Sequence, residues 1–240
     1  MPKDRRFPNQ VTNVQNVESS VTSMLHCSSV MKKDILIRKG TPHDSDDFAS
    51  LIVISSPTLF PAVFGAKAGN ILKALFCHRH NLFSFRHCHF IEVGGRIAGM
   101  TLSYDWQAAN RERLKTGLLL LKYMKTQLLT RLSTLLEAHT VLSKIGDGEY
   151  YVSNLAVYPD HRNLGLGTRL LVQTENEAKK FGAGRVVLEV EADNQDAIQL
   201  YEKNGYAVAR ELEEIAASKK TFKFLQMSKL ITPIPRNAAT

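Results

Sequence analysis

The sequence feature that most constrains the fold is an apolar run followed by a glycine-containing turn and a helical pattern. Residues 152–157 have the composition of a strand, Gly165 and Gly167 follow a turn, and a helical pattern begins at Thr168. The first N–H groups of a helix lack backbone partners, and the helix dipole adds partial positive charge there. Glycine lets the backbone approach a ligand closely or adopt positive φ. The segment therefore predicts a site for a phosphate or pyrophosphate.

The two glycines alone do not define the ligand. A mononucleotide-binding loop would end in Gly-Lys-Ser/Thr, whereas Gly167 is followed by Thr168 and Arg169. A dinucleotide fingerprint needs a third glycine, and Leu170 occupies that position. A tight strand-to-helix turn that binds nothing is the alternative interpretation.

A second motif lies downstream in the order Asn-x-x-Ala-x-x-Leu-Tyr-x-x-x-Gly-Tyr. With the glycine loop, the combined pattern resembles the GCN5-related N-acetyltransferase (GNAT) superfamily, closely over 150–206 and more loosely over 34–230. The residues that carry the resemblance are Arg162, Gly165, Gly167, Asn194, Ala197, Leu200, Tyr201, Gly205 and Tyr206. The resemblance implies a mixed α/β (α+β) fold, in which helices flank a central, twisted, mixed and mostly antiparallel sheet.

The same resemblance implies an activity and a donor site. GNAT enzymes transfer an acetyl group directly from acetyl-coenzyme A (acetyl-CoA) to an amine. Backbone groups of the fourth strand hold the pantetheine arm, and loop N–H groups hold the pyrophosphate. The corresponding positions are Leu155, Ala156 and Val157 on the strand, then Arg162, Asn163, Leu164, Gly165, Leu166, Gly167 and Thr168 in the loop, with Asn194 and Tyr201 beyond. Asn194 is equally suited to cap its own helix.

Two residues are candidates for proton transfer. A tyrosine hydroxyl with an ordinary pKa near 10 can protonate a departing thiolate, which suits Tyr201 as general acid. Glu189 lies in the apolar run 186–190 and precedes Tyr201 by twelve residues, as a glutamate does in the superfamily's protein N-terminal acetyltransferases. Glu189 is therefore the candidate base. A structural strand glutamate is the alternative, and Glu149 is a weaker candidate.

Composition limits the remaining possibilities. The 240 residues are 44% hydrophobic, which suits one globular domain with extensions, and the net charge of +8 favours anionic ligands. Nucleic acid is an unfavoured partner, because neither an aromatic-interleaved RNA motif nor zinc-finger spacing is present. The three cysteines form no disulfide framework, which predicts a reducing, cytoplasmic setting. Neither a secretory signal nor an apolar run long enough to span a membrane is visible.

The chain divides into three predicted parts. Residues 1–33 form a polar, disordered extension, 34–230 the acetyltransferase domain, and 231–240 a tail. Within the domain we expect a strand at 34–39, a helix to about 55, an apolar loop at 57–65, a helix over about 66–82, and a hairpin with a Gly94-Gly95 turn; after Tyr206 we expect a strand at 207–212, a polar loop at 213–220 and a last strand at 222–230. The apolar loop is either core or one wall of an acceptor pocket.

A cluster of cysteine and histidine residues precedes and enters the hairpin. Cys77, His78 and His80 lie near a helix end, and His87, Cys88 and His89 lie at the start of a strand. Their spacing directs them to different faces, so we expect ordinary histidines and no metal site.

Residues 106–145 depart from the minimal GNAT pattern, in which the third strand leads closely to the fourth. Leucines recur at helical spacing, at positions 114, 118, 121, 128, 132, 135 and 142, which predicts a helical insertion. Three interpretations remain open: helices that pack their leucine face on the domain or on a second subunit, a lid over the acceptor, or a basic helix at a membrane surface.

The resulting hypothesis is an N-acetyltransferase that uses acetyl-CoA and no metal. Its acceptor would be a primary amine on a protein N-terminus, a peptide or a small molecule. The alternative is a non-catalytic acyl-CoA-binding module that regulates or recruits a partner. A homodimer is compatible with either hypothesis.

Overall fold

The computed structural model describes residues 34–124, 145–212, 214–217 and 220–234. Expectations for 1–33, for the leucines at 128, 132, 135 and 142, and for 235–240 therefore lie outside the described residues. The first half of the described chain contains β1 (Ile35–Lys39), α2 (Ser45–Ser55), α3 (Leu59–Phe64), α4 (Ala68–Cys77), β2 (Cys88–Val93), β3 (Arg96–Asp105) and α5 (Trp106–Met124). The second half contains β4 (Glu149–Val157), α7 (Leu166–Lys180), β5 (Arg185–Glu191), α8 (Gln195–Lys203), β6 (Ala207–Glu211), β7 (Ile215–Ala217), β8 (Lys220–Phe222) and β9 (Phe224–Leu230).

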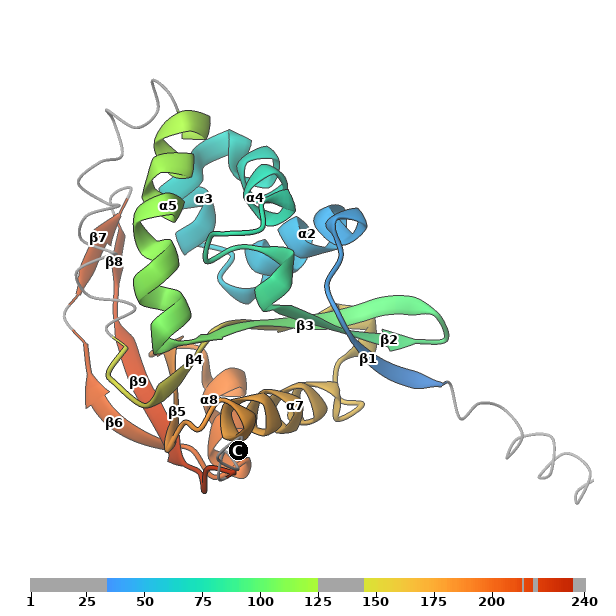
Figure 1. The fold of residues 1–240 in the computed structure, drawn as a ribbon, viewed down its shortest axis with the longest axis vertical. Coiled ribbons are helices and arrows are strands. Elements are labelled where there is room, and N and C mark those ends of the chain that lie inside the picture. The colour runs from blue at the N-terminus through green and yellow to red at the C-terminus, as the bar shows by residue number, and fades with distance from the viewer. Residues whose placement is uncertain (1–33, 125–144, 213, 218–219, 235–240) are drawn as a thin grey trace, which may run out of the picture. The chain divides into compact units, whose positions relative to one another are not determined.

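A seven-stranded sheet forms the centre of the described fold, in the order β1-β2-β3-β4-β5-β9-β6. Only β4 and β5 pair in parallel, and the other neighbours are antiparallel. Helices α2 to α5 lie on one side of the sheet and α7 and α8 on the other (Figure 1). This arrangement confirms the predicted mixed, mostly antiparallel sheet flanked by helices, and α5 follows β3 as the predicted helical insertion does.

Each face of the sheet carries its own apolar core. On the side of α2 and α4, Phe48, Phe76 and Phe90 are fully buried, and Phe48 and Phe76 stack with ring centroids 4.2 Å apart. On the side of α7 and α8, Leu171 and Leu188 are among the buried residues. The two cores hold the strands between them, so the positions of side chains at the strand ends are well defined.

Gly99 lies where β3 comes very close to β4. A Cβ atom there would approach the carbonyl oxygen of Ala156 to 2.6 Å and Cα of Val157 to 3.1 Å. The pairing of β2 with β3 is also irregular opposite this residue, between Ile91 and Glu92. Gly99 therefore marks both a close contact with β4 and an irregularity in the pairing with β2.

We expect Gly99→Ala to lower the free energy of unfolding by about 1–3 kcal/mol, because the backbone atoms of β4 cannot move away without losing pairing. Gly69→Ala is the matched control, since a Cβ at Gly69 in α4 would meet nothing within 4 Å. Alanine also favours a helix, so this control should gain about 0.5–1 kcal/mol. Urea unfolding of both variants measures the difference, and equal stabilities would contradict the close approach of β3 to β4.

Strands β4 and β5 separate halfway along their length. Their parallel pairing runs only from Glu149 with Arg185 to Val152 with Leu188. Beyond that point β4 stays paired with β3 as far as Val157, and β5 stays paired with β9 as far as Glu191. The two strands therefore diverge beyond this point, and the space between them is called the wedge below. Helices α7 and α8 lie on the same side of the sheet (Figure 1).

The predicted loop at 57–65 is instead a short helix, α3. Pro61 is compatible with a helix here because it lies in the first turn, where backbone N–H groups have no helical acceptor. Gly65 ends α3 with a φ of 67°. The prediction of a polar loop at 213–220 is also wrong for Ile215–Ala217 and Lys220, since β7 and β8 pair as a two-stranded antiparallel sheet.

One described stretch, Leu59–Cys77, is long and apolar enough to cross a membrane by composition alone. It is not one continuous helix, because Gly65–Lys67 forms a 3-10 turn between α3 and α4. Leu72, Leu75 and Phe76 are fully buried among residues of the core. These are the properties of core helices.

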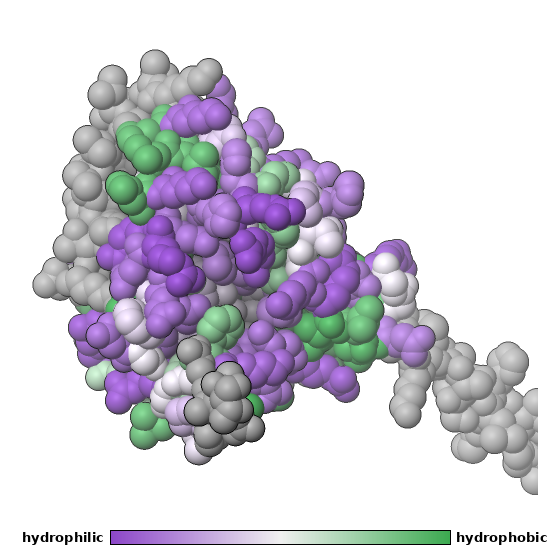
Figure 2. Space-filling model, in the orientation of Figure 1, coloured by the Kyte–Doolittle hydropathy of each residue, from purple (hydrophilic) through white to green (hydrophobic). Residues whose placement is uncertain are grey.

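Helix α5 contacts the domain through a different face from the one predicted. Thr116 and Met124 are buried and Leu120 is partly buried, whereas the leucine stripe at 114, 118 and 121 is exposed by 76%, 56% and 47%. Figure 2 shows the corresponding apolar patch over α5. Both faces repeat at helical spacing, and packing beside α4 buries the one centred on Thr116. The expectation that these three leucines pack on the domain is therefore wrong.

Candidate active site

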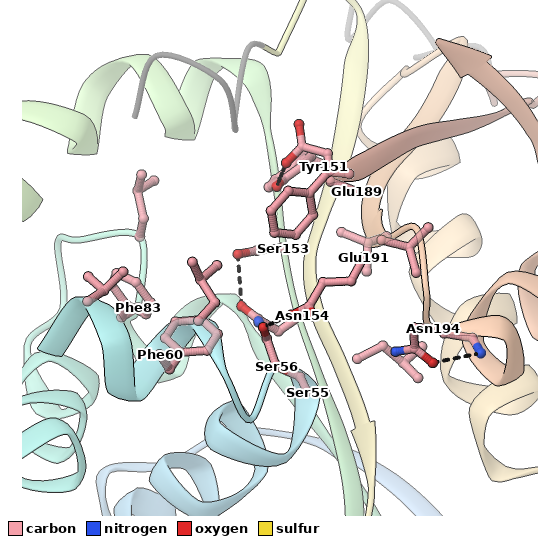
Figure 3. Close-up of a pocket in the computed structure, with 18 of the residues that line it drawn as sticks. Ser55, Ser56, Phe60, Phe83, Tyr151, Ser153, Asn154, Glu189, Glu191 and Asn194 are labelled. Carbon is pink, nitrogen blue, oxygen red and sulfur yellow. Dashed lines mark hydrogen bonds between the residues drawn. The ribbon is translucent and has the colours of Figure 1, made fainter. Parts of the chain in front are cut away.

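A cavity of about 280 Å³ occupies the wedge between β4 and β5, near the lower end of the usual range for small-molecule pockets. Its polar side chains come from the ends of α2, β4 and β5 and from the start of α8 (Figure 3). Its apolar wall comes from α3, α5 and the segment before β2. Of the sequence-predicted site residues, the cavity brings together Leu155, Glu189, Asn194 and Tyr201.

Glu189 is held in the cavity by a tyrosine that sequence reasoning missed. Tyr151 lies opposite Val187 in the parallel pairing of β4 and β5, and Glu189 lies two residues further along the same face of β5. The Tyr151 hydroxyl donates to Oε2 of Glu189 over 2.5 Å. This bond orients a half-buried carboxylate toward the cavity (Figure 3). Glu149, the weaker candidate base, instead accepts a bond from the backbone N–H of Gly146 and pairs with Arg185.

Glu191 is a second carboxylate in the same cavity. It shares a face of β5 with Glu189 and accepts a hydrogen bond from the hydroxyl of Ser56, at the end of α2. Next to it, Asn154 donates to Oγ of Ser55 over 2.8 Å and accepts from Ser153 over 2.9 Å. The two-residue spacing of the glutamates was visible in the sequence. Their partners were not, because they lie on distant segments.

Tyr201 reaches the cavity from α8. Only 7% of it is exposed, and its ring packs against that of Tyr206 with centroids 6.0 Å apart. Burial raises the pKa of Tyr201 to about 12 because the ionised phenolate would lose its hydration. The hydroxyl therefore keeps its proton at neutral pH. Asn194 caps α8, since its Oδ1 accepts from the N–H of Ala197 over 3.2 Å, so the capping interpretation of this residue is confirmed.

The predicted anion loop has the geometry of an open helix N-terminus. Gly165 caps α7 in the left-handed conformation with φ 71°, and Asn163 also has positive φ. The first helical bond runs from the N–H of Arg169 to the carbonyl of Gly165. Within the described part of the chain, no backbone carbonyl accepts from the N–H groups of residues 164–168. Helix α7 thus begins at Leu166, two residues earlier than predicted, and its free N–H groups suit an anion.

The two glycines of the loop have different roles. A Cβ on Gly165 would meet nothing within 4 Å, so only its backbone conformation requires glycine. A Cβ on Gly167 would lie 3.0 Å from Cδ2 of Leu200 and 3.8 Å from Cδ2 of Leu155. Gly167 therefore lets α7 pack against α8 and against β4 at the edge of the cavity. This packing joins the anion loop to the wedge.

The other predicted loop residues surround this N-terminus without lining the cavity. Arg162, Asn163 and Leu164 are exposed, Leu166 is buried in the core, and the hydroxyl of Thr168 accepts from Asn204 over 3.2 Å. Ala156 is buried and Val157 half-buried, so these two offer the ligand backbone atoms rather than side chains.

Two of the histidines that precede β2 have ordinary hydrogen-bond partners. His78 bonds to the hydroxyl of Tyr123 over 2.7 Å, and His87 to Glu112 over 2.8 Å. Across the described ranges, no three His, Cys, Asp or Glu side chains gather in a way that would hold a metal ion.

The model of the acetyltransferase (GNAT) family matches residues 60–206, which is more than half of the chain. The chain belongs to this family. The matched range includes the wedge, the anion loop, Glu189 and Tyr201.

Curated relatives match over short segments. The mycothiol acetyltransferase of Corynebacterium aurimucosum is 44% identical over 64 residues, which are 27% of this chain and 20% of that protein. The [ribosomal protein bS18]-alanine N-acetyltransferase of Escherichia coli is 45% identical over 53 residues, 22% of this chain and 36% of that one. N-alpha-acetyltransferase 30 of Schizosaccharomyces pombe is 36% identical over 56 residues, which are 23% of this chain and 37% of that protein. The chain thus spans well under half the length of these relatives.

Solved structures share the fold over most of the chain. An N-acetyltransferase from Staphylococcus aureus superposes with a TM-score of 0.58 at 19% identity, over 80% of this chain and 99% of that one. The ribosomal-protein-S18-alanine N-acetyltransferase of Escherichia coli superposes with a TM-score of 0.51 at 18% identity, over 86% of this chain and 100% of that one.

Proposed function

We propose that this protein transfers an acetyl group from acetyl-CoA directly to a primary amine, in a complex that holds both substrates. The observation that carries the proposal is the wedge between β4 and β5, where Glu189 and Tyr201 line one cavity beside a helix N-terminus with free N–H groups. The acceptor is an amine on a protein N-terminus, a peptide or a small molecule, the range that the family's activity allows.

The donor would bind along β4 and the start of α7. Backbone groups of Leu155, Ala156 and Val157 would hold the pantetheine arm, on the edge of β4 that no longer pairs with β5. The N–H groups from Leu164 to Thr168 would hold the pyrophosphate, and exposed Arg162 would add positive charge. Asn194, at the mouth of the cavity, would contact the pantetheine.

Acetyl-CoA supplies an activated acetyl group as a thioester. Glu189 would accept the proton that the amine loses as its nitrogen bonds to the acetyl carbon. Tyr201 would donate its hydroxyl proton to the sulfur as the carbon–sulfur bond breaks, and solvent would return a proton to Tyr201. Tyr151 would keep the carboxylate of Glu189 directed into the cavity through its 2.5 Å bond.

We expect Tyr201→Phe to lower kcat by about 100-fold and to leave the Kd of acetyl-CoA unchanged, since only the proton donor is lost. Thiol release from acetyl-CoA over a panel of amines and peptides measures turnover, and calorimetry measures binding. Because the pKa of Tyr201 is about 12, its proton is present below that pH, and ionisation of Tyr201 should cause no loss of wild-type kcat between about pH 7 and about pH 10. If Tyr201→Phe retained full turnover, the general acid would have to be another group.

The second candidate is a non-catalytic acyl-CoA-binding module that recruits a partner or a second copy of the chain. The exposed leucines at 114, 118 and 121 on α5 favour it, because contiguous exposed apolar side chains often mark interaction surfaces. Acetyl-CoA binding without turnover across the whole panel would support this candidate over the enzyme.

For the setting of the reaction we propose the cytoplasm. The supporting observation is that Cys77 and Cys88 are both free thiols, as expected in a reducing compartment.

A further inference from the structure

The charged side chains among the described residues that line the cavity are carboxylates, whereas the whole chain has a net positive charge. Glu189 and Glu191 both line it, and none of the described residues that line it is a lysine, arginine or histidine. Both carboxylates are fixed by hydroxyl donors, Tyr151 for Glu189 and Ser56 for Glu191. An ammonium group that enters the wedge therefore meets two oriented hydrogen-bond acceptors. A carboxylate next to that ammonium group on the same ligand would be repelled by the two glutamates.

The wall that faces these carboxylates is apolar. It consists mainly of aromatic and aliphatic side chains from α3, from α5 and from the segment before β2: Leu59, Phe60, Val63, Phe64, Leu82, Phe83 and Leu120. Phe60 and Phe83 lie across the cavity from Glu191 in Figure 3.

The polar side chain on this wall is already occupied. The hydroxyl of Thr116 donates to the carbonyl of Glu112 over 2.8 Å and accepts from the N–H of Leu82 over 2.9 Å. A ligand body with its own N–H and C=O groups would lose water here without side-chain partners on the wall, which costs binding energy. An apolar body loses nothing and gains from burial.

We infer that the acceptor is a small primary amine with an aromatic or branched apolar body and no carboxylate next to the amine. Its amine binds between Glu189 and Glu191 as an ammonium ion and loses one proton to solvent to become the neutral nucleophile, before Glu189 accepts the second proton during transfer. Its body packs against Phe60 and Phe83. Free amino acids are excluded because their α-carboxylate would lie beside two glutamates. Peptide N-termini are disfavoured because their amide groups would face the apolar wall. This inference rests on the proposed function.

The first test compares acceptors that differ in the carboxylate, in the apolar body or in the presence of peptide groups. Initial rates are measured with acetyl-CoA and phenethylamine, phenylalanine, ethylamine, or a tetrapeptide that begins with phenylalanine. We expect kcat/KM for phenethylamine to exceed that for phenylalanine by at least about 100-fold, because a like charge beside the carboxylates costs several kcal/mol. A higher kcat/KM for the peptide than for phenethylamine would overturn the inference, as would equal values for phenethylamine and phenylalanine.

The second test changes the two parts of the proposed acceptor site, which are the carboxylates and the apolar wall. Glu191→Gln should lower the preference for phenethylamine over phenylalanine by about tenfold, whereas Glu202→Gln, an exposed glutamate on α8, should leave it unchanged. Phe60→Ala should lower the preference for phenethylamine over ethylamine by about tenfold, because it removes the apolar wall and not the charge. Unchanged preferences in both pocket variants would overturn the inference.

The two proposals fail in different ways. Turnover of peptides or amino acids without a preference for apolar amines overturns this inference and leaves the acetyltransferase function standing. Binding of acetyl-CoA with no turnover of any acceptor overturns both. Calorimetry with CoA present is the independent readout: phenethylamine should bind at least about tenfold more tightly than phenylalanine, and the reverse order contradicts the subsite.

Discussion

Glu189→Gln should lower kcat by about 1,000-fold while the Kd of acetyl-CoA stays within about twofold of wild type. Glutamine keeps the shape of the side chain and can accept the bond from Tyr151, but it cannot take a proton. General bases contribute about 10²–10⁴-fold to rates.

Glu149→Gln is the matched control for this variant. Glu149 lies on neighbouring strand β4, but its carboxylate bonds to Gly146 and Arg185 and does not line the cavity. Its loss should leave kcat within about threefold of wild type, since it touches neither substrate. Steady-state rates with a saturating amine decide the matter: a large loss in Glu149→Gln with little loss in Glu189→Gln would reverse the assignment of the base.

Gly165→Asp should weaken acetyl-CoA binding by about 100- to 1,000-fold. Gly165 caps α7 with a φ of 71°, next to the free N–H groups of residues 164–168. An aspartate there would place a negative charge against the pyrophosphate and would also strain the backbone. Calorimetric titration with acetyl-CoA gives the Kd directly, and an unchanged value would remove the pyrophosphate from this loop.

Gly182→Asp separates the effect of charge at the loop from backbone strain. Gly182 follows the other end of α7, has a φ of 78°, and likewise has open space around its Cβ position. The substitution introduces the same strain and the same charge far from the helix N-terminus. We expect both variants to lose stability, Gly182→Asp more because its charge lies at the negative end of the helix dipole, and a loss of affinity only in Gly165→Asp.

Local motifs predicted the backbone features of the glycine loop and of the start of α8. The positive φ of Gly165 and the capping of α8 by Asn194 depend on residues within a few positions of each other. The hairpin turn at Gly94-Gly95 was predictable for the same reason, since both glycines adopt positive φ. Short-range backbone rules are sufficient for such features.

The acceptor side was not predictable in this way. Ser56 bonds to Glu191 across 135 residues of sequence, and Tyr151 bonds to Glu189 across 38. The sequence predicts a loop where α3 forms because Pro57 and Pro61 lie close together there, although Pro61 lies in the first turn of α3, which tolerates it. The buried face of α5 was chosen by its packing beside α4, and leucine spacing alone pointed to the opposite face.

The sequence by itself determined the family, the mixed sheet, and the glycine loop and helix on which the proposed anion site rests, because these depend on local order and spacing along the chain. The tertiary structure alone decided that β4 and β5 separate after Val152 and Leu188, and that two carboxylates meet an apolar wall in the gap. Strand separation depends on how β3 and β9 hold the two strands from either side, and no local pattern encodes that balance. The chemistry proposed for the acceptor therefore rests on packing between distant segments.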